Sequence, residues 1–256
     1  MRNLKIRNPF NANVYHEETV TSTMDVSRVI AEAGEQHGTV ITADFQEAGR
    51  GRIRDRAWQM EKKMSLAFTI LLRYPRVQEI PPAITLRTGL AVSLAIEDFA
   101  PSLHGSVMVK WPNDIVIYSK KISGILCEAD DGNVHIGIGI NIAQREFPAH
   151  LREKATSIAL ATGMEITQDA RFLLLEKILE RLYCELETGE NENWKFRMEQ
   201  RLYKKDERVI FMEGAANSGK KVEGRINGIG PNGELLITPD GEKEPRSFIT
   251  GELIFF

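Results

Sequence analysis

Cysteine, long apolar runs and a strong net charge are all lacking in this chain. Its 256 residues contain two cysteines, Cys127 and Cys184, and neither has a partner at metal-ligand spacing, so we expect reduced thiols rather than a disulfide framework. No apolar run approaches the roughly eighteen residues that a membrane-spanning helix needs. The formal net charge of −3 argues against a general nucleic-acid binder.

A targeting segment, a metal signature and a catalytic nucleophile are not recognisable either. Residues 1–6 contain no apolar stretch of the kind found in signal peptides, and we expect a cytoplasmic protein. The five histidines are scattered without a pair at zinc-ligand spacing, so no metal ligands are predicted. No serine or cysteine stands with a recognisable base.

Length and composition indicate an ordinary globular protein in two parts. Hydrophobic residues make up 42% and charged residues 27% of the chain, as in typical globular domains. Past Lys205 the pattern changes to four short strand-like runs separated by turns. This change predicts a mixed α+β catalytic or binding domain over residues 1–204 and a small β-barrel over residues 205–256.

Apolar periodicity predicts the elements of the first part. Three segments have the stripe of an amphipathic helix: residues 21–35, 82–99 and 167–188. In the first of them the stripe is Val26, Val29, Ile30 and Ala33. Six segments have the pattern of strands: residues 40–45, 64–72, 107–111, 114–118, 121–128 and 134–142. Tight turns separate the last four strands, which predicts an antiparallel meander.

The most informative segment is rich in glycine and arginine and runs from Gly49 to Trp58. Arginines occupy every second position from 50 to 56. Glycines let the backbone approach a ligand, and guanidinium groups suit phosphate or carboxylate oxygens. A solvated basic turn is the alternative, and the segment by itself supports both readings equally.

Further polar residues lie at strand ends. In the segment 110–114, Lys-Trp-Pro-Asn-Asp, the charged pair Lys110 and Asp114 can project into one cleft, whereas turn chemistry alone explains Asn113. Lys121 begins the next strand, where it could neutralise an anion, although a single lysine there is more often a solvated strand edge.

Glycines interrupt the two strands that follow. Gly124 inside a strand indicates close approach of a ligand or of another backbone. In residues 137–141, Gly-Ile-Gly-Ile-Asn, one face has no side chains and could form the floor of a flat ligand slot. The segment is not a dinucleotide fingerprint, because the G-x-G-x-x-G spacing and a following helix are absent.

Together, the order and spacing of these motifs resemble those of the biotin protein ligases, or biotin–[acetyl-CoA-carboxylase] ligases. The resemblance runs from Ser22-Thr23 to the terminal module. It implies a catalytic domain related to the class II aminoacyl-tRNA synthetases, followed by a small Src-homology-3-like barrel. It also implies that ATP activates biotin as biotinyl-5′-AMP, with Mg²⁺ carried by ATP, and that biotin passes to a lysine of a biotin carboxyl-carrier protein.

The resemblance implies a role for each matching residue. Biotin would contact Ser22, Thr23, Gln46, Arg50, Gly51, Arg52, Lys121, Gly124 and Leu126. ATP would contact Arg50, Arg52, Trp58, Lys110, Asn113, Asp114 and Asn141, with Trp58 on the adenine side. Lys121 and Arg52 would be catalytic through their charge, and Asp114 would orient or deprotonate the acceptor lysine. The arginine loop would close over the adenylate and exclude water.

The chain departs from the family pattern in three places. Met24 stands where the family often has asparagine after Ser-Thr, so we expect one polar contact to biotin to be lost or made by backbone. The loop is one residue longer than usual, which leaves Arg54 and Arg56 as alternatives for the later arginine. About twenty residues precede Ser22, too few for a helix-turn-helix domain, so we expect ligase activity without operator binding, in a monomer or a homodimer.

Two other functions fit parts of the pattern. A lipoate or octanoate ligase, or the corresponding transferase, would share the fold, but the motifs at Lys110 and Lys121 favour biotin. A non-catalytic binder of biotin or nucleotide would release no pyrophosphate, and it would have little need for the arginine loop.

Overall fold

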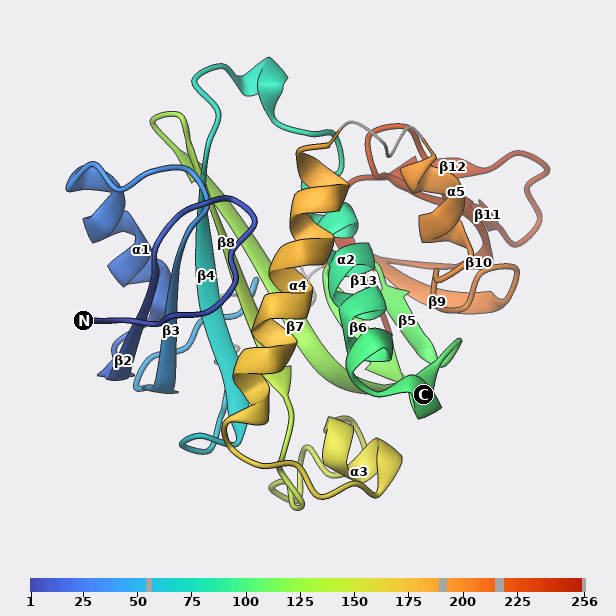
Figure 1. Cartoon of the computed structure of the whole chain (residues 1–256). Coiled ribbons are helices and arrows are strands. Elements are labelled where there is room, and N and C mark those ends of the chain that lie inside the picture. Colours follow the sequence, from blue (N-terminus) through green and yellow to red (C-terminus); the bar gives the residue numbers. More distant parts are fainter. Residues whose placement is uncertain (54–56, 189–192, 215–218, 255–256) are drawn as a thin grey trace.

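The computed structural model describes residues 1–53, 57–188, 193–214 and 219–254. Over these ranges, a large mixed sheet has the spatial order β1-β2-β3-β4-β8-β7-β6-β5 (Figure 1). Its strands are β1 Arg2–Asn3, β2 Val14–Val20, β3 Thr39–Gln46, β4 Ser65–Arg73, β5 Val107–Lys110, β6 Asp114–Ile117, β7 Lys120–Asp130 and β8 Asn133–Asn141. The strands from β5 to β8 pair antiparallel in sequence, which confirms the predicted meander.

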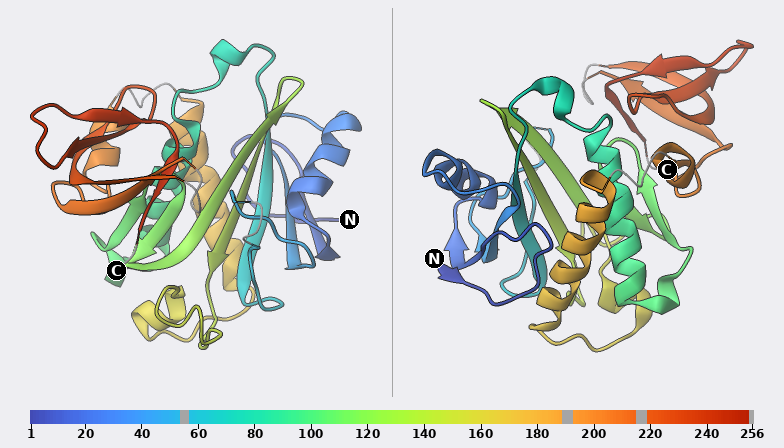
Figure 2. Two further views of the ribbon diagram at one scale, coloured as in Figure 1. Left: turned by 180° about the vertical axis from the view of Figure 1, so that it is seen from behind. Right: turned by 45° about the horizontal axis from the view of Figure 1, so that its top comes forward.

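Helices cover both faces of this sheet, as the views in Figure 2 show. The helices are α1 Thr23–Glu32, α2 Ile84–Phe99, α3 Ile158–Thr162, α4 Ala170–Leu186 and α5 Trp194–Glu199, with single 3₁₀ turns η1 Val77–Glu79 and η2 Pro101–Leu103. On one face, α2 and α4 pack together with buried leucines such as Leu90, Leu175 and Leu179. Burying each such side chain contributes about 2 kcal/mol. The opposite face carries α1 and leaves β6, β7 and the end of β8 for the pocket described below.

The start of the chain forms a unit that the periodicity did not predict. Strand β2 runs parallel to β3, and α1 connects the two, so this edge is a β-α-β unit joined to an antiparallel sheet. The predicted stripe of α1 is also wrong in part: Val29 is 65% exposed and Ala33 is exposed. Ile30 is buried as predicted, and Met24 and Ser27 face the sheet with it, because the helix begins at Thr23 with Ser22 as its N-cap.

A second, smaller sheet forms the C-terminal part. Its strands are β9 Arg208–Glu213, β10 Lys220–Ile229, β11 Leu235–Pro239, β12 Arg246–Phe248 and β13 Gly251–Leu253, in the order β12-β11-β10-β9-β13. The sequence pattern anticipated the first four strands and missed β13. Trp111 joins the two parts, because its indole Nε1 donates a hydrogen bond to the carbonyl oxygen of Gly233 at 2.9 Å. The boundary at residues 204/205 stays a prediction.

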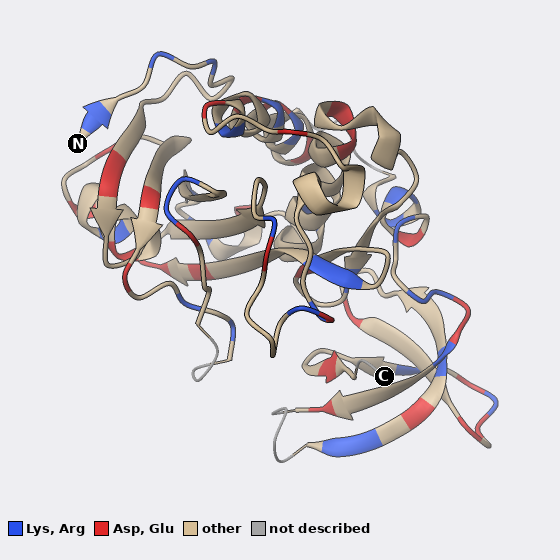
Figure 3. Cartoon of the chain, turned by 90° about the horizontal axis from the view of Figure 1, so that it is seen from below, with Lys and Arg blue, Asp and Glu red and all other residues tan. Residues whose placement is uncertain are grey.

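Charge is distributed evenly over the fold. In Figure 3, basic and acidic segments are interspersed along both parts of the chain. Across the described ranges, every helix is too short or too polar to cross a bilayer.

Candidate functional site

A pocket on the open face of the large sheet collects all but one of the predicted site residues. These lining residues are Ser22, Thr23, Gln46, Arg50, Gly51, Arg52, Trp58, Lys110, Asn113, Asp114, Lys121, Gly124 and Leu126. The exception is Asn141, which is buried beside the pocket. Its Nδ2 donates to the carbonyl oxygen of Thr156 and its Oδ1 accepts from Gln144, so it braces the loop after β8. Its role as an ATP ligand stays a prediction.

Strand register builds the floor of the pocket. Asp114 on β6 stands opposite Gly124 on β7, and Gly124 stands opposite Gly139 on β8. Two residues further along β7, Leu126 pairs with Gly137 of β8. Because side chains alternate between the faces of a strand, these residues share one face. The glycines of β7 and β8 therefore form one patch of the floor, and the Asp114 carboxylate lies at its end.

Two side chains of the protein cover the glycines of β8 on the floor. A β-carbon at Gly139 would lie 2.5 Å from Cε2 of Trp58, and one at Gly137 would lie 2.8 Å from Sδ of Met24. Trp58 and Met24 therefore lie close against these glycines. Gly137 and Gly139 also line the pocket, in agreement with the prediction that residues 137–141 form the floor of a ligand slot.

Hydroxyl and amide groups form the end of the pocket beside α1. The backbone N–H and the hydroxyl of Thr23 both donate to Oε1 of Gln46, at 2.8 and 3.0 Å. Thr69 on β4 donates to the Thr23 hydroxyl at 2.8 Å. Ser22 and Thr23 are almost fully buried, with exposures of 1% and 3%. This network fixes the orientation of Gln46 and leaves its amide N–H groups available to an acceptor on a ligand.

The opposite end of the floor carries paired charges. Nζ of Lys121 lies 2.6 Å from Oδ1 of Asp114, and both side chains are partly exposed to the pocket. Lys110 is buried directly across from Asp114 in the β5–β6 register. The amide of Asn113 donates to the carbonyl oxygen of Ile125 at 2.8 Å, so this side chain joins the turn before β6 to β7.

The glycine–arginine segment forms the rim of the pocket. The backbone N–H of Trp58 donates to the carbonyl oxygen of Gly49 at 2.9 Å and closes the segment into a loop. Nη2 of Arg50 lies 2.6 Å from Oδ1 of Asp25 at the start of α1. Nη2 of Arg52 donates to the carbonyl oxygen of Gly251 at 3.0 Å. The choice between residues 54 and 56 falls outside the described residues.

Sequence reasoning missed the contribution of the C-terminal part. Glu252 on β13 lines the same pocket as Lys121, although the two residues are far apart in the sequence. No local pattern marks a glutamate near the end of a chain as a pocket residue. Met24, at which we expect one polar contact to biotin to be lost or made by backbone, is buried and forms a wall of the pocket.

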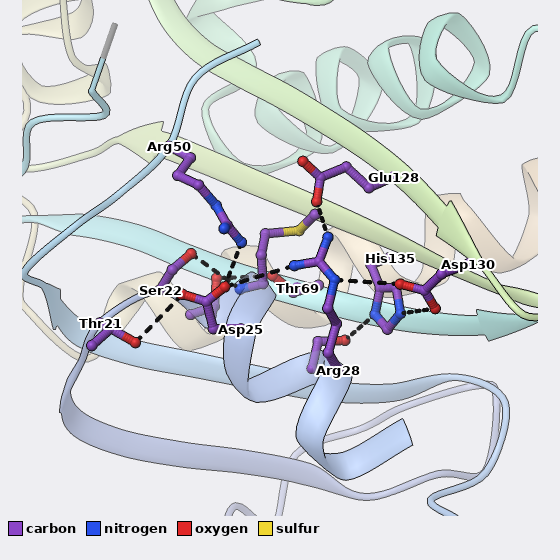
Figure 4. Close-up of polar contacts among 12 residues, drawn as sticks. Thr21, Ser22, Asp25, Arg28, Arg50, Thr69, Glu128, Asp130 and His135 are labelled. Carbon is purple, nitrogen blue, oxygen red and sulfur yellow. Dashed lines mark hydrogen bonds and ion pairs between the residues drawn. The ribbon is translucent and has the colours of Figure 1, made fainter. Parts of the chain in front are cut away.

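A serine of α1, a histidine of β8 and an aspartate of β7 meet between the helix and the sheet, outside the pocket. Figure 4 labels the histidine and the aspartate, His135 and Asp130. The Ser27 hydroxyl lies 2.7 Å from Nδ1 of His135, whose Nε2 lies 3.3 Å from Asp130. Burial lowers the pKa of His135 more than the neighbouring carboxylate raises it, which favours the neutral ring. Ser27 and His135 have no exposed surface, so the arrangement stabilises the fold and offers no access to a substrate.

Comparisons with known proteins agree with this geometry. Residues 17–143 match the model of the biotin/lipoate A/B protein ligase family. The bifunctional ligase/repressor BirA of Bacillus subtilis is 36% identical over 60% of this chain, and the chain spans only 48% of that relative. The biotin–[acetyl-CoA-carboxylase] ligase of Paracoccus denitrificans is 28% identical over 84% of this chain and 89% of its own length.

Solved structures extend the likeness to the whole fold. The biotin protein ligase from Aquifex aeolicus in complex with biotin and ATP superposes with a TM-score of 0.78 at 28% identity, covering 94% of this chain and 97% of that chain. The resemblance to biotin protein ligases that the motifs indicated is therefore confirmed. The chain belongs to the biotin/lipoate A/B protein ligase family.

Proposed function

We propose that this protein is a biotin–[biotin carboxyl-carrier protein] ligase. It activates biotin with ATP and transfers it to a lysine of a carrier domain. The observation that carries the proposal is the composition of one pocket, in which hydroxyl and amide groups lie at one end and Lys121, Arg50 and Arg52 supply positive charge. Relatives named as biotin ligases, and a related structure that holds biotin and ATP, support the same function.

In the first step, the biotin carboxylate attacks the α-phosphorus of ATP, and the bond to pyrophosphate breaks. Two anions must approach each other, so cations at the reacting centre stabilise the charge that develops. Lys121 lies at the end of the floor that carries Asp114. Arg50 and Arg52 reach the pocket from the rim. Ser22, Thr23 and Gln46 orient the ring end of biotin, as proposed from the family resemblance.

In the second step, a carrier lysine attacks the acyl carbon of biotinyl-AMP, and AMP leaves. The attacking amine must be neutral, and Asp114 is the carboxylate on the pocket floor that accepts or orients its proton. Its ion pair with Lys121 at 2.6 Å holds that carboxylate at the floor of the pocket. Trp58 and the rim arginines cover the mixed anhydride and limit its hydrolysis.

Magnesium belongs to the nucleotide in this proposal. Across the described ranges, no three acidic, histidine or cysteine side chains come together. Mg²⁺ prefers to keep its waters and to bind phosphate oxygens, and it would screen the charge of the ATP phosphates.

Finer features of the family are part of the same proposal. These are a class II synthetase-like catalytic domain over residues 1–204, a Src-homology-3-like barrel over residues 205–256, a cytoplasmic location and a monomeric or homodimeric state. The prediction that the 256-residue polypeptide binds no operator is tested by a gel shift with the operator duplex at low salt, where a sequence-specific shift would contradict it.

The proposed function is tested by transfer of labelled biotin to a purified carrier domain, with pyrophosphate release measured in parallel. We expect biotin- and ATP-dependent labelling of one carrier lysine, and no labelling when that lysine is replaced by arginine. The same assay with lipoate in place of biotin distinguishes a biotin ligase from a lipoate ligase. Efficient lipoate transfer without biotin transfer would contradict the proposal, and tight biotin binding without pyrophosphate release would identify a mere binder.

A further inference from the structure

A carboxylate outside the predicted site holds Arg50 at the rim of the pocket. Nη2 of Arg50 lies 2.6 Å from Oδ1 of Asp25, and the exposed fractions of the two side chains are 41% and 44%. Figure 4 shows the guanidinium of Arg50 pointing toward the carboxylate at the start of α1. Arg50 therefore has an ion-pair partner within the protein itself.

A second cation, Arg28, lies beside Asp25 at a longer distance. Nη1 of Arg28 forms an ion pair with Oδ1 of Asp25 at 3.7 Å, which is too long for a hydrogen bond. The same guanidinium contacts Glu128 through Nη2, and its Nε lies 3.3 Å from Asp130 (Figure 4). Arg28 thus joins α1 to β7 and shares the carboxylate of Asp25 with Arg50, which is the nearer partner.

The first turn of α1 fixes the position of Asp25. Its backbone N–H donates to the carbonyl oxygen of Ser22 at 3.1 Å, and the Thr21 hydroxyl lies 3.5 Å from its Oδ2. Ser22 and Thr23 on the same turn line the pocket. One short segment therefore both lines the ligand site and places the rim guanidinium relative to it.

We propose that Asp25 is a positioning residue for biotin activation. It holds one edge of the Arg50 guanidinium, so that the remaining N–H groups point into the pocket toward the substrate carboxylate. A guanidinium has five donors in a rigid fork, and fixing one edge beforehand reduces the side-chain entropy lost when the ligand binds. The inference rests on the proposed function, because it assigns Arg50 to that substrate.

Two effects of removing the carboxylate oppose each other, and this makes the proposal testable. Loss of orientation weakens the binding of biotin, whereas loss of a negative charge near the pocket strengthens the binding of an anion. Biotin-dependent exchange of pyrophosphate into ATP measures the balance. For D25N we expect the KM for biotin to rise about five-fold, the upper range for a partly exposed ion pair, with kcat nearly unchanged. D25E restores most of the affinity.

A matched control and a double variant separate positioning from a general effect. Glu32 is an exposed acid at the end of the same helix, and E32Q leaves the KM unchanged. In an R50Q background, D25N adds no further increase, because Asp25 acts through Arg50. An unchanged or lower KM in D25N, or an equal rise in the R50Q background, overturns this inference alone. A wild-type protein without biotin-dependent exchange overturns the proposed function as well.

Discussion

The floor and the rim of the pocket are built in different ways. The floor belongs to neighbouring strands, so the register of β6, β7 and β8 decides that Asp114, Gly124 and Gly139 lie in one row. The rim joins Arg52 to Gly251, across 199 residues of sequence. Local patterns in the sequence therefore encode the floor, whereas the rim depends on packing between the two sheets.

The largest expected effect comes from removing charge from the floor. K121Q leaves Asp114 without its ion partner and removes a cation from the reacting centre, so we expect the rate of biotinyl-AMP formation to fall about 100-fold. The measurement is single-turnover formation of the adenylate.

The neighbouring lysine provides the control. Lys120 pairs with the exposed Glu153 outside this pocket, and K120Q retains nearly the full rate. Equal losses in K120Q and K121Q would show that general surface charge matters and not the position on the floor.

The second-largest expected effect concerns Gly251 of the C-terminal sheet, whose carbonyl oxygen accepts the hydrogen bond from Arg52 of the rim. Gly251 has φ +146°, and a β-carbon there would lie 2.2 Å from Cζ of Phe211. We expect G251A to reduce the free energy of unfolding by about 2 kcal/mol, measured by urea denaturation. G241A is the control, because Gly241 has φ +85° with nothing within 4 Å of the added carbon; that variant shows only the backbone cost of about 1 kcal/mol. Similar losses in both variants would exclude packing against Phe211 as the cause.

A smaller effect separates the two side chains that cover the floor. In G139A the new methyl group meets the ring of Trp58, which is rigid, whereas in G137A it meets the flexible thioether of Met24. We expect the KM for biotin to rise about ten-fold in G139A, roughly 1.4 kcal/mol, and much less in G137A. Thermal unfolding accompanies the kinetics, and a matching loss of stability in G139A would attribute the change to the fold instead.

The smallest effect concerns pH and a buried carboxylate outside the pocket. Asp44 on β3 is buried beside His16 and Arg171. Burial raises the pKa of its carboxyl, but the hydrogen bond from His16 and the charge of Arg171 outweigh burial and hold the pKa below the ordinary 3.8. The unfolded chain therefore binds more protons, so this contribution to stability is present above pH 3.8 and is lost as the pH falls further. Urea unfolding between pH 5 and pH 3 should show a steeper loss for wild type than for D44N; parallel curves would contradict the assignment.

The sequence predicted the floor well, since its signals are local. Turns at Asn113 and Asp131 set the antiparallel meander, and strand spacing then brought Lys121 and Gly124 to the pocket face. The rest depends on distant contacts. Strand β2 lies parallel to β3, and the connection by α1 makes this pairing possible. Trp58 lies over Gly139 although the loop and the strand are far apart in sequence. Glu252 reaches the pocket through the packing of β13, which no periodicity records.

The position of Trp58 also makes the pocket visible to spectroscopy. Its indole lies on the floor glycines, and Nε1 is buried without a hydrogen-bond partner among the described residues. The chain has three tryptophans. Trp194 is 8% exposed and lies outside the pocket, whereas Trp111 is 3% exposed and lines the pocket together with Trp58. A ligand that enters the pocket therefore changes the surroundings of Trp58 and Trp111. The protein thereby carries its own fluorescent reporter of occupancy, and W194F would sharpen that signal without altering the lining.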